Sequence, residues 1–409
     1  MPSDALPYGL TAEALVAAEA EPDPGSLAAG TRLRMRFGPD LAAAALTQAA
    51  LRRRGRTKFG EAAAGLWFTR DGLEQATRPE VADLHARRFV AAGVRRVVDL
   101  GCGIATDASA FVRAGLDVLA VERDPVTAAV ARANLDVAVA AGGDRVRAEV
   151  VVADVAEVLA AGIEPGSGVF ADPARRDARG RVWRTQDFSP DLAPLLALAD
   201  GERVLGLKLG PALPHALVPP DAEAEWVSHH GDVVEVALWS GPGSVPGRRS
   251  ALLWPDRRLV AGPDRLDVRT PGAVVYEPDG AVIRSGAVAA LGDRLGAGLL
   301  AEQIAYLTSD VLVETPFATA FTVERVLPYD PKALRRWVRE AGVGRLEVKR
   351  RGLDLDPAQL RRELRPRGDA SATLLLSRTP TGTVALVVHR AGPAEPGAGP
   401  AVAGGPDHL

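Results

Sequence analysis

One segment constrains the fold of this 409-residue chain more than any other: residues 96–107, with the sequence RVVDLGCGIATD. An apolar run ends in Asp99, a glycine-rich turn follows, and a helix-like stretch begins near Thr106. Gly101 and Gly103 can adopt backbone angles that other residues avoid, and they let a ligand approach the main chain closely. The segment therefore predicts a buried strand, a tight loop and a helix N-terminus, the layout that nucleotide-type cofactors use.

Residues 94–254 continue this pattern, because short apolar runs alternate with helix-like stretches. The apolar runs cover residues 97–100, 118–121, 146–152, 168–171 and 204–209. The helix-like stretches between them cover residues 107–114, 125–139, 155–161 and 191–199. This alternation predicts an α/β fold with a doubly wound, Rossmann-like parallel sheet. Residues 233–239 and 251–254 are strand-like with no long helix between them, so we expect an antiparallel pair that closes the sheet.

The rest of the chain divides into further segments. Residues 1–93 are expected to be helical, with Pro/Gly breaks between alanine- and leucine-rich stretches at 11–21, 40–53 and 79–92. Residues 255–329 are expected to form a connector that is helical near 287–305. A small α+β domain is predicted over 330–392, with helices at 331–341 and 357–364 and strands at 345–349, 373–377 and 384–389. The tail, residues 393–409, is rich in Gly, Pro and Ala and is expected to be disordered.

Acidic residues follow the first four predicted strands, at the edge where doubly wound folds bind ligands. Asp99 ends the first strand and Asp172 follows the fourth. Glu122 ends the second strand and can accept both ribose hydroxyls of an adenosine group, while Asp154 after the third can accept from the adenine amino group. A dinucleotide dehydrogenase would share the first two acids, but it normally carries a longer Gly-x-Gly-x-x-Gly, and Thr106 occupies the third glycine position here.

On these residues, the segment 94–254 resembles the class I S-adenosylmethionine-dependent methyltransferases. Residues 98–103 look like their first motif, Glu122 like their ribose acid and Asp154 like their adenine acid. Residues 172–175 (DPAR) resemble the Asp/Asn-Pro-Pro-aromatic motif of enzymes that methylate exocyclic amines of bases.

The whole chain is similar to a bacterial family of methyltransferases that end in a THUMP-like domain. The segments that carry this closer match are GLEQA (72–76), DPARR (172–176), YEP (276–278) and KRRG (349–352). The resemblance implies S-adenosyl-L-methionine as the cofactor and RNA as the substrate, because true THUMP domains bind RNA. The candidate cofactor-binding residues are Asp99, Gly101, Cys102, Gly103, Asp107, Glu122, Arg123 and Asp154, and the candidate catalytic residues are Asp172, Pro173 and Arg175.

The chemistry explains why an acid at residue 172 is suited to amine methylation. An exocyclic amine is a poor nucleophile because its lone pair is delocalised into the ring, and acceptors for its N–H bonds shift electron density toward the methyl group. Asp172 Oδ and the Pro173 carbonyl are the expected acceptors. Ala174-Arg175 replaces the second proline and the aromatic residue of the amine-methylating pattern, so Arg175 could stack on a base or bind phosphate, and Trp183 or Phe188 could supply the ring. Nitrogen is the leading acceptor hypothesis.

Several of these residues also have plain structural explanations. Cys102 can simply fill space in the loop, Asp107 can cap the next helix, and Asp172 can belong to a turn. Lys208, at the end of the fifth predicted strand, can face the substrate or form a salt bridge. His229-His230 has no further ligands at metal spacing, which favours a packing role.

Positive charge is concentrated near the C-terminus. Residues 330–390 contain fourteen Lys/Arg and seven Asp/Glu, whereas the whole chain has a net charge of −3. A basic domain on an acidic body fits binding to the RNA backbone, and the candidate contacts are Lys349, Arg350, Arg351, Arg361 and Arg362. The alternative is a solvated arginine-rich face, because the chain has 45 arginines and four lysines. Trp337 is the only aromatic residue of this region, which favours backbone or shape recognition over base stacking.

A second basic run, residues 52–58 (RRRGRTK), either binds phosphate or is a solvated helix end.

Composition excludes several other classes. The single cysteine excludes a disulfide framework and multi-cysteine metal sites, and no metal is expected. No signal-peptide pattern and no run of about 18 apolar residues occurs, so we expect a cytoplasmic protein without a membrane partner.

Taken together, the motifs, the resemblance and the basic C-terminal domain predict a methyltransferase that modifies a base of structured RNA, either rRNA or tRNA. The alternatives are a methyltransferase for a small molecule or a protein, and a non-catalytic protein that binds S-adenosylmethionine and RNA.

Overall fold

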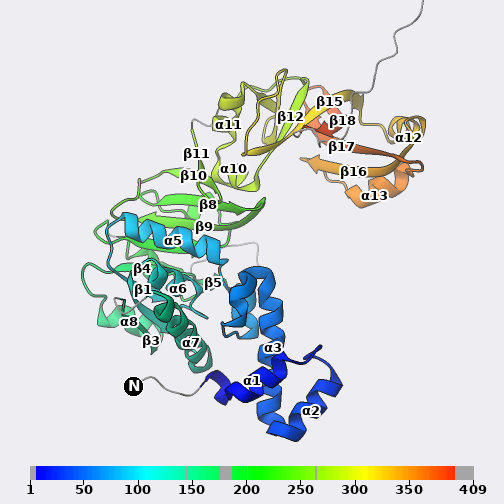
Figure 1. Ribbon diagram of the computed structural model, residues 1–409. Coiled ribbons are helices and arrows are strands. Elements are labelled where there is room, and N and C mark those ends of the chain that lie inside the picture. Colours follow the sequence, from blue (N-terminus) through cyan, green and yellow to red (C-terminus); the bar gives the residue numbers. More distant parts are fainter. Residues whose placement is uncertain (1–5, 143–145, 176–186, 200, 263–264, 392–409) are drawn as a thin grey trace, which may run out of the picture. The chain divides into compact units, whose positions relative to one another are not determined.

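The computed structural model describes residues 6–142, 146–175, 187–199, 201–262 and 265–391 (Figure 1). The chain divides into two compact units, Met1–Asp256 and Arg257–Leu409. The predicted tail at 393–409 lies outside the described residues. Within the described ranges, no helix combines the length and the apolar character needed to cross a membrane.

The first unit begins with a group of helices, in agreement with the prediction for residues 1–93. Thr11 and Ser26 begin α1 and α2 by accepting hydrogen bonds of 3.2 Å from backbone N–H groups of the first helical turns. Alanines of the long helix α3 form one side of the buried cluster with α1, because their small side chains allow close approach. These elements are η1 (Pro7–Gly9), α1 (Ala12–Glu19), α2 (Leu27–Phe37), α3 (Pro39–Phe59), η2 (Gly60–Ala64), α4 (Arg70–Gln75) and α5 (Pro79–Ala91).

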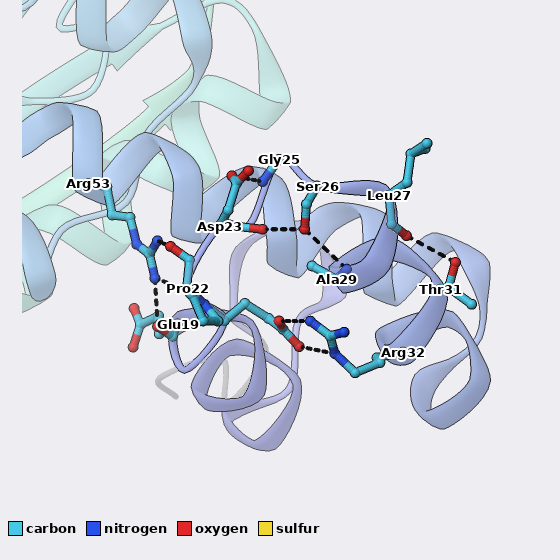
Figure 2. A network of polar contacts seen from close by, with 11 residues as sticks. Glu19, Pro22, Asp23, Gly25, Ser26, Leu27, Ala29, Thr31, Arg32 and Arg53 are labelled. Atoms are coloured by element: carbon cyan, nitrogen blue, oxygen red, sulfur yellow. Dashed lines mark hydrogen bonds and ion pairs between the residues drawn. The ribbon is translucent and has the colours of Figure 1, made fainter.

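The basic run 52–58 is used inside this helical group. Arg53 donates to the carbonyl groups of Glu19 and Pro22 in the turn between α1 and α2 (Figure 2). Arg52 donates to the Leu66 carbonyl at 2.9 Å, and Lys58 donates to three carbonyl groups at the end of α4 at 2.7–2.9 Å. These three side chains satisfy helix and turn carbonyls. Arg54 and Arg56 of the same run are exposed, at 4.0 and 3.9 Å from the carboxylates of Glu74 and Glu61, which fits the solvated helix end.

The next part of the first unit is a twisted sheet whose strands lie in the order β10-β8-β9-β7-β4-β1-β2-β3. Pairing is parallel except that β9 runs antiparallel to β7 and β8, which confirms the doubly wound α/β prediction. The elements are β1 (Arg96–Leu100), α6 (Thr106–Arg113), β2 (Asp117–Glu122), α7 (Pro125–Gly142), β3 (Ala148–Val152), α8 (Val155–Ala161), β4 (Gly168–Ala171), β5 (Ala174–Arg175), β6 (Phe188–Ser189), α9 (Leu192–Leu196), β7 (Leu205–Leu209), η4 (His215–Leu217), β8 (Glu223–His229), β9 (Asp232–Ser240) and β10 (Arg249–Leu253).

The predicted antiparallel pair of residues 233–239 and 251–254 is wrong. β9 pairs with β7 and β8, and β10 pairs in parallel with β8. The strand β8 was missed because its sequence, EAEWVSH, carries polar residues that the fold nevertheless buries. Glu223, for example, is fully buried and pairs with Arg88 and Arg248.

One of the N-terminal helices, α5, shares a core with the sheet. Ala82, Ala86 and Phe89 of α5 belong to the same buried cluster as α6, α7 and the central strands. Farther along the sheet, Val81 of α5 contacts the cluster that contains Val227 of β8. The helix α5 therefore covers the sheet like a helix of the α/β core, although it precedes the first strand.

A tight contact joins α4 to the glycine-rich loop after β1. A Cβ atom added at Gly72 would lie 2.3 Å from Ile104 Cγ2 and 2.5 Å from Thr69 Oγ1. Only a glycine leaves room for the loop at this distance. The GLEQA segment that the sequence analysis singled out thus packs directly on the loop.

The second unit contains a single mixed sheet with strands in the order β13-β14-β12-β15-β18-β17-β16. Its elements are β11 (Arg257–Val260), β12 (Val274–Pro278), α10 (Gly280–Ser285), α11 (Val288–Leu295), β13 (Gly298–Ala301), β14 (Ile304–Ser309), β15 (Ala318–Pro328), α12 (Pro331–Glu340), β16 (Val343–Arg351), α13 (Pro357–Leu364), β17 (Ala370–Thr379) and β18 (Gly382–Arg390). The helices and strands predicted over 330–392 are therefore confirmed.

The connector prediction for residues 255–329 needs correction, because β12, β13, β14 and β15 belong to the same sheet as the C-terminal strands. The helix predicted near 287–305 ends at Leu295, since Gly296 adopts a left-handed conformation. Beyond it, Ile304–Ser309 forms a strand, with Tyr306 buried in the core. Alanine and leucine content alone did not reveal this change of structure.

The contact between α4 and the loop can be tested by replacing Gly72 with alanine. We expect Gly72→Ala to lower the free energy of unfolding by about 1–3 kcal/mol, because the new methyl group overlaps Ile104. Urea or thermal unfolding of the purified protein measures the change. Gly65→Ala is the matched control, since its Cβ would meet nothing closer than 3.8 Å and its φ is −93°. Equal stability of the two variants would contradict the packing.

Candidate active site

The parallel strands bring their terminal acids to one edge of the sheet. Leu100 of β1 is in register with Ala171 of β4 and with Val121 of β2. Asp99, Asp172 and Glu122 therefore lie within a residue or two of the same line across three adjacent strands. Burial raises the pKa of Asp99, and the nearby charges of Asp107, Asp172 and Glu122 raise it further. Asp99 and these three acids, which are four of the predicted site residues, therefore lie close together around the end of β1.

The loop after β1 has the conformation that its glycines predict. Gly101 and Gly103 have φ values of +84° and +56°. The backbone N–H groups of Gly101 and Cys102 both donate to the Val121 carbonyl at 2.9 Å, and the Gly103 N–H donates to Glu122 Oε2 at 3.1 Å. A Cβ atom at Gly103 would meet nothing within 4 Å, so this side of the loop is open to a ligand.

Asn134 of α7 fixes the same loop from inside the protein. Its Nδ2 donates to the carbonyl groups of Ile104 and Trp67 at 2.9 and 3.0 Å, and its Oδ1 accepts from the Trp67 N–H at 2.8 Å. Sequence reasoning did not select this residue. A signal existed, because Asn134 is a polar residue on the buried stripe of α7 that also contains Val130, Ala131 and Ala138.

A cavity of about 880 Å³ opens beside the loop. The first unit supplies its walls from α3, the start of α4, the glycine loop and the end of β2, including Gln48, Phe68, Gly72, Gly103, Glu122 and Arg123. This volume lies in the range of small-molecule sites. At Gly103 a ligand in this cavity can lie directly against the main chain, because no side chain is in the way. The carboxylate of Glu122 can accept hydrogen bonds from hydroxyl groups of the ligand. These residues fit the adenosyl part of a nucleoside cofactor.

The other predicted cofactor residues have different surroundings. Asp154 is exposed and caps α8, where its Oδ1 accepts from the Ala156 N–H at 2.8 Å in a reciprocal capping box with Glu157. Burial raises the pKa of the Cys102 thiol well above its usual value, so a filling role in the loop fits better than nucleophilic chemistry. The side chain of Arg175, and residues Arg176 and Trp183, lie outside the described part of the chain.

Asp107 is part of a buried polar chain and is not a helix cap. Its Oδ2 accepts from Thr77 Oγ1 at 2.6 Å, and its Oδ1 contacts His85 Nδ1 at 2.8 Å. The other ring nitrogen of His85 contacts Glu235 Oε1 at 2.7 Å. Burial opposes the charged imidazolium, but the Glu235 and Asp107 carboxylates outweigh it and raise the pKa of His85 to about 10. The chain joins α5 and α6 to β9, and His85 was missed because it precedes the recognised core.

Asp172 forms an ion pair with Lys208 at the ends of the neighbouring strands β4 and β7. Burial raises the pKa of the Asp172 carboxyl, and Lys208 offsets part of that rise. Burial alone would lower the pKa of Lys208, but Asp172 and Glu235 raise it above its usual value. The salt-bridge alternative for Lys208 is thus realised, and it gives the Asp172 carboxylate a fixed cationic partner.

The basic segment 349–351 of the second unit has partners within that unit. Lys349 Nζ lies 2.8 Å from Glu277 Oε2, and Arg351 lies 3.6 Å from Glu277 Oε1 and over the ring of Tyr306. Arg350 is exposed and donates to the Leu353 carbonyl at 2.5 Å. The YEP and KRRG segments therefore meet in an internal ion pair. Arg361 and Arg362, in contrast, are exposed on the last turn of α13.

An α/β sheet with a glycine loop after its first strand and a ribose-type acid after its second defines a protein that binds a nucleoside cofactor. The chain belongs to the S-adenosylmethionine-dependent methyltransferases. Two curated relatives with that description, both called uncharacterized, come from the CDC 1551 / Oshkosh and H37Rv strains of Mycobacterium tuberculosis. Each is 34% identical over 366 residues, which is 87% of this chain and 98% of the relative. The protein is thus an enzyme whose cofactor is S-adenosylmethionine.

Further comparisons support the fold and the C-terminal domain. A crystal structure described as a methyltransferase from Porphyromonas gingivalis W83 covers 93% of this chain and 98% of its own, with a TM-score of 0.75 and 23% identity. Residues 318–390 match a family model described as THUMP domain-like, and residues 11–55 match a domain of unknown function (DUF8688). The THUMP-like match begins at residue 318, the first residue of β15, and so starts before residue 330.

The role of Glu122 can be tested by Glu122→Gln. We expect the affinity for S-adenosylmethionine to fall by about 1–3 kcal/mol, because a buried hydroxyl–carboxylate hydrogen bond is weakened. Isothermal titration calorimetry measures this change. Glu149→Gln removes the same charge from an exposed position of β3 and should leave affinity unchanged. Unaltered binding by Glu122→Gln would remove Glu122 from the cofactor site.

The buried His85 chain predicts a specific pH dependence of stability. A pKa raised from 6.5 to about 10 means that the imidazolium stabilises the folded state fully below pH 6.5, and that this stabilisation is lost as the pH rises toward 10. The free energy of unfolding of the native protein should therefore fall relative to His85→Gln by about 1.4 kcal/mol per pH unit between about pH 7 and pH 10.

Lys58 changes the free energy of unfolding with pH in the opposite direction, because burial lowers its pKa to about 8. This contribution is present in both the native protein and His85→Gln, so it cancels when one curve is subtracted from the other. Urea unfolding at several pH values gives both curves. Parallel curves for the native protein and the variant would show that His85 is not held as an imidazolium.

Proposed function

We propose that this methyltransferase modifies an exocyclic amine of a base in structured RNA, either rRNA or tRNA. The observation that carries the chemical part is the position of Asp172, which follows β4 in register with the end of β1 and is paired with Lys208. When bound, S-adenosylmethionine supplies an activated methyl group on a sulfonium. The chain then has to position the acceptor, since holding reactants in line contributes a large part of such a rate enhancement.

In this proposal the Asp172 carboxylate and the Pro173 carbonyl accept the N–H bonds of the amine. The ion pair with Lys208 holds the carboxylate in one orientation. Asp172 acts as a hydrogen-bond acceptor that directs the lone pair of the amine and not as a strong base. The antiparallel contact of Ala174 and Arg175 with Ser189 and Phe188 supports the backbone that follows Asp172. Arg175 remains a proposed contact to the base or to a phosphate.

The RNA part of the proposal is supported by the second unit. Its C-terminal part matches the THUMP domain-like family over residues 318–390, and residues 330–390 carry twice as many Lys/Arg as Asp/Glu. A concentration of cations on one domain suits a polyanionic substrate. A methyltransferase for a small molecule or a protein would have no evident use for this domain.

The test incubates the protein with methyl-labelled S-adenosylmethionine and RNA from cells that lack the gene, followed by nucleoside analysis. We expect label in one nucleoside, on a base nitrogen. Asp172→Ala, which removes the acceptor oxygens, should lower the rate roughly 10²–10³-fold, as for the loss of one preorganised transition-state contact, and leave cofactor affinity within about twofold. Asp117→Ala, which removes a carboxylate at the opposite edge of the sheet, should retain full activity.

Two outcomes would contradict the proposal. Undiminished transfer by Asp172→Ala would exclude Asp172 from the reaction. A protein that binds S-adenosylmethionine but transfers no label to RNA would show that its substrate belongs to another class.

A further inference from the structure

A groove of about 850 Å³ crosses the surface of the second unit. It lies where the strands β16, β17 and β18 meet the C-terminal end of α13. Five arginines line it, namely Arg345, Arg361, Arg362, Arg365 and Arg390, and the only carboxylate on its lining is that of Glu347. The groove is therefore strongly cationic. Its arginines lie outside residues 349–351, the KRR segment.

The arginines reach the groove from separate elements. Arg345 comes from β16 and Arg390 from the end of β18, while Arg361 and Arg362 belong to the last turn of α13. Arg365 follows that helix in a left-handed conformation. A solvated helix end would explain the cations of α13, because the helix dipole favours them there. It does not explain why two strands add arginines to the same hollow.

Most of this charge is not neutralised within the described residues. Arg361, Arg365, Arg345 and Arg390 form no ion pair there, and Arg345 Nε donates only to Ser371 Oγ at 3.1 Å. Arg362 lies 4.0 Å from Asp356, and both side chains are more than half exposed, so this pair contributes little. Lys349 and Arg351 differ, because both are paired with Glu277, and Glu347 lies 3.8 Å from Lys349 as well. The groove has guanidinium groups available for an external anion.

The lining also indicates how an anion would be recognised. Its one ring is the imidazole of His389, whose Nε2 lies 2.9 Å from Glu324 Oε2. The groove offers no free aromatic ring on which unstacked bases could stack, and its guanidinium groups can bind phosphate oxygens in a bidentate manner. Ser371 and Thr373 add hydroxyl groups at its floor. These features suit a sugar–phosphate backbone whose bases are paired and turned away.

We infer that this arginine groove, and not the KRR segment, binds successive phosphates of a base-paired RNA segment. The inference rests on the proposed function, since it assigns to the RNA substrate a contact surface on the second unit. Binding there is independent of base identity and selects helical RNA by its backbone. The contact proposed is between guanidinium groups and phosphodiester oxygens.

The experiment compares two triple variants of the full chain that lose the same charge. Arg345→Gln, Arg361→Gln and Arg365→Gln together remove the groove cations. Arg325→Gln, Arg336→Gln and Arg339→Gln together remove exposed cations of the same unit that do not line the groove. Fluorescence anisotropy with an RNA hairpin measures affinity at several salt concentrations. Thermal unfolding and S-adenosylmethionine affinity should be the same for both variants, which shows that folding is intact.

We expect the groove variant to bind the hairpin at least roughly tenfold more weakly, with a salt-dependence slope smaller by roughly two to three units, as for the loss of three phosphate contacts. The control variant should bind within about twofold of the native protein. Equal losses in both variants, or no loss in the groove variant, would overturn the inference. Preference for single-stranded RNA, or equal binding of a DNA duplex of the same sequence, would overturn its assignment to base-paired RNA.

Methyl transfer at limiting RNA separates this inference from the proposed function. Transfer to RNA by the native protein that persists undiminished in the groove variant would reject the groove and leave the proposed function intact. Groove-dependent hairpin binding without any methyl transfer to RNA would reject the proposed function and leave the groove as a binding site.

Discussion

The structure of the first unit depends on how the loop after β1 is held. Hydrogen bonds from Gly101 and Cys102 to the Val121 carbonyl fix one side of this loop to β2. Asn134 fixes the other side to α7 and to the segment before α4. Gly72 packs against it with no space to spare. The N-terminal helices contact the loop and also line the cavity beside it, so the walls of the cavity depend on the packing of the N-terminal segment.

Paired charge forms the second constraint. The buried imidazole of His85 lies between Asp107 and Glu235, and the partly buried Lys208 lies against Asp172. Charges removed from water are costly unless each has an opposite partner, and removal of one partner leaves the other unpaired. The two groups lie at the strand ends, close enough that Lys208 responds to the carboxylates of both. They keep the site polar and rigid at the point where an acceptor would be positioned.

Much of the first unit could be predicted from sequence, because its signals are local. The apolar run, acid and glycines of residues 96–107 predict β1 and its loop, and the helix-like stretch 155–161 forms α8 as expected. The capping role of Asp154, which was selected as the adenine acid, was not predicted. The strand β8 could not be predicted, since Glu223 and its arginine partners are far apart in sequence and meet only in the folded chain.

The candidate site divides in the same way. Residues at strand ends follow from the order of elements, so Asp99, Glu122 and Asp172 could be selected in advance. His85 and Asn134 depend on tertiary contacts of helices that carry no motif. In the second unit, the sequence suggests that the KRR segment is a free basic patch. The structure shows that Glu277, which is 72 residues from Lys349 along the chain, pairs with it. Net charge indicates which domain is suited to an anionic partner, but only the structure indicates which of its cations are available.

We propose that the cavity lined by the N-terminal helices, the glycine loop and the end of β2 holds the cofactor, with its methyl group directed to Asp172. A crystal structure of the protein with S-adenosylhomocysteine is the decisive measurement. We expect Glu122 to accept the ribose hydroxyls, the ligand to pass over the open face of Gly103, and the sulfur to lie nearest to Asp172. Ligand density elsewhere, with this cavity empty, would contradict it.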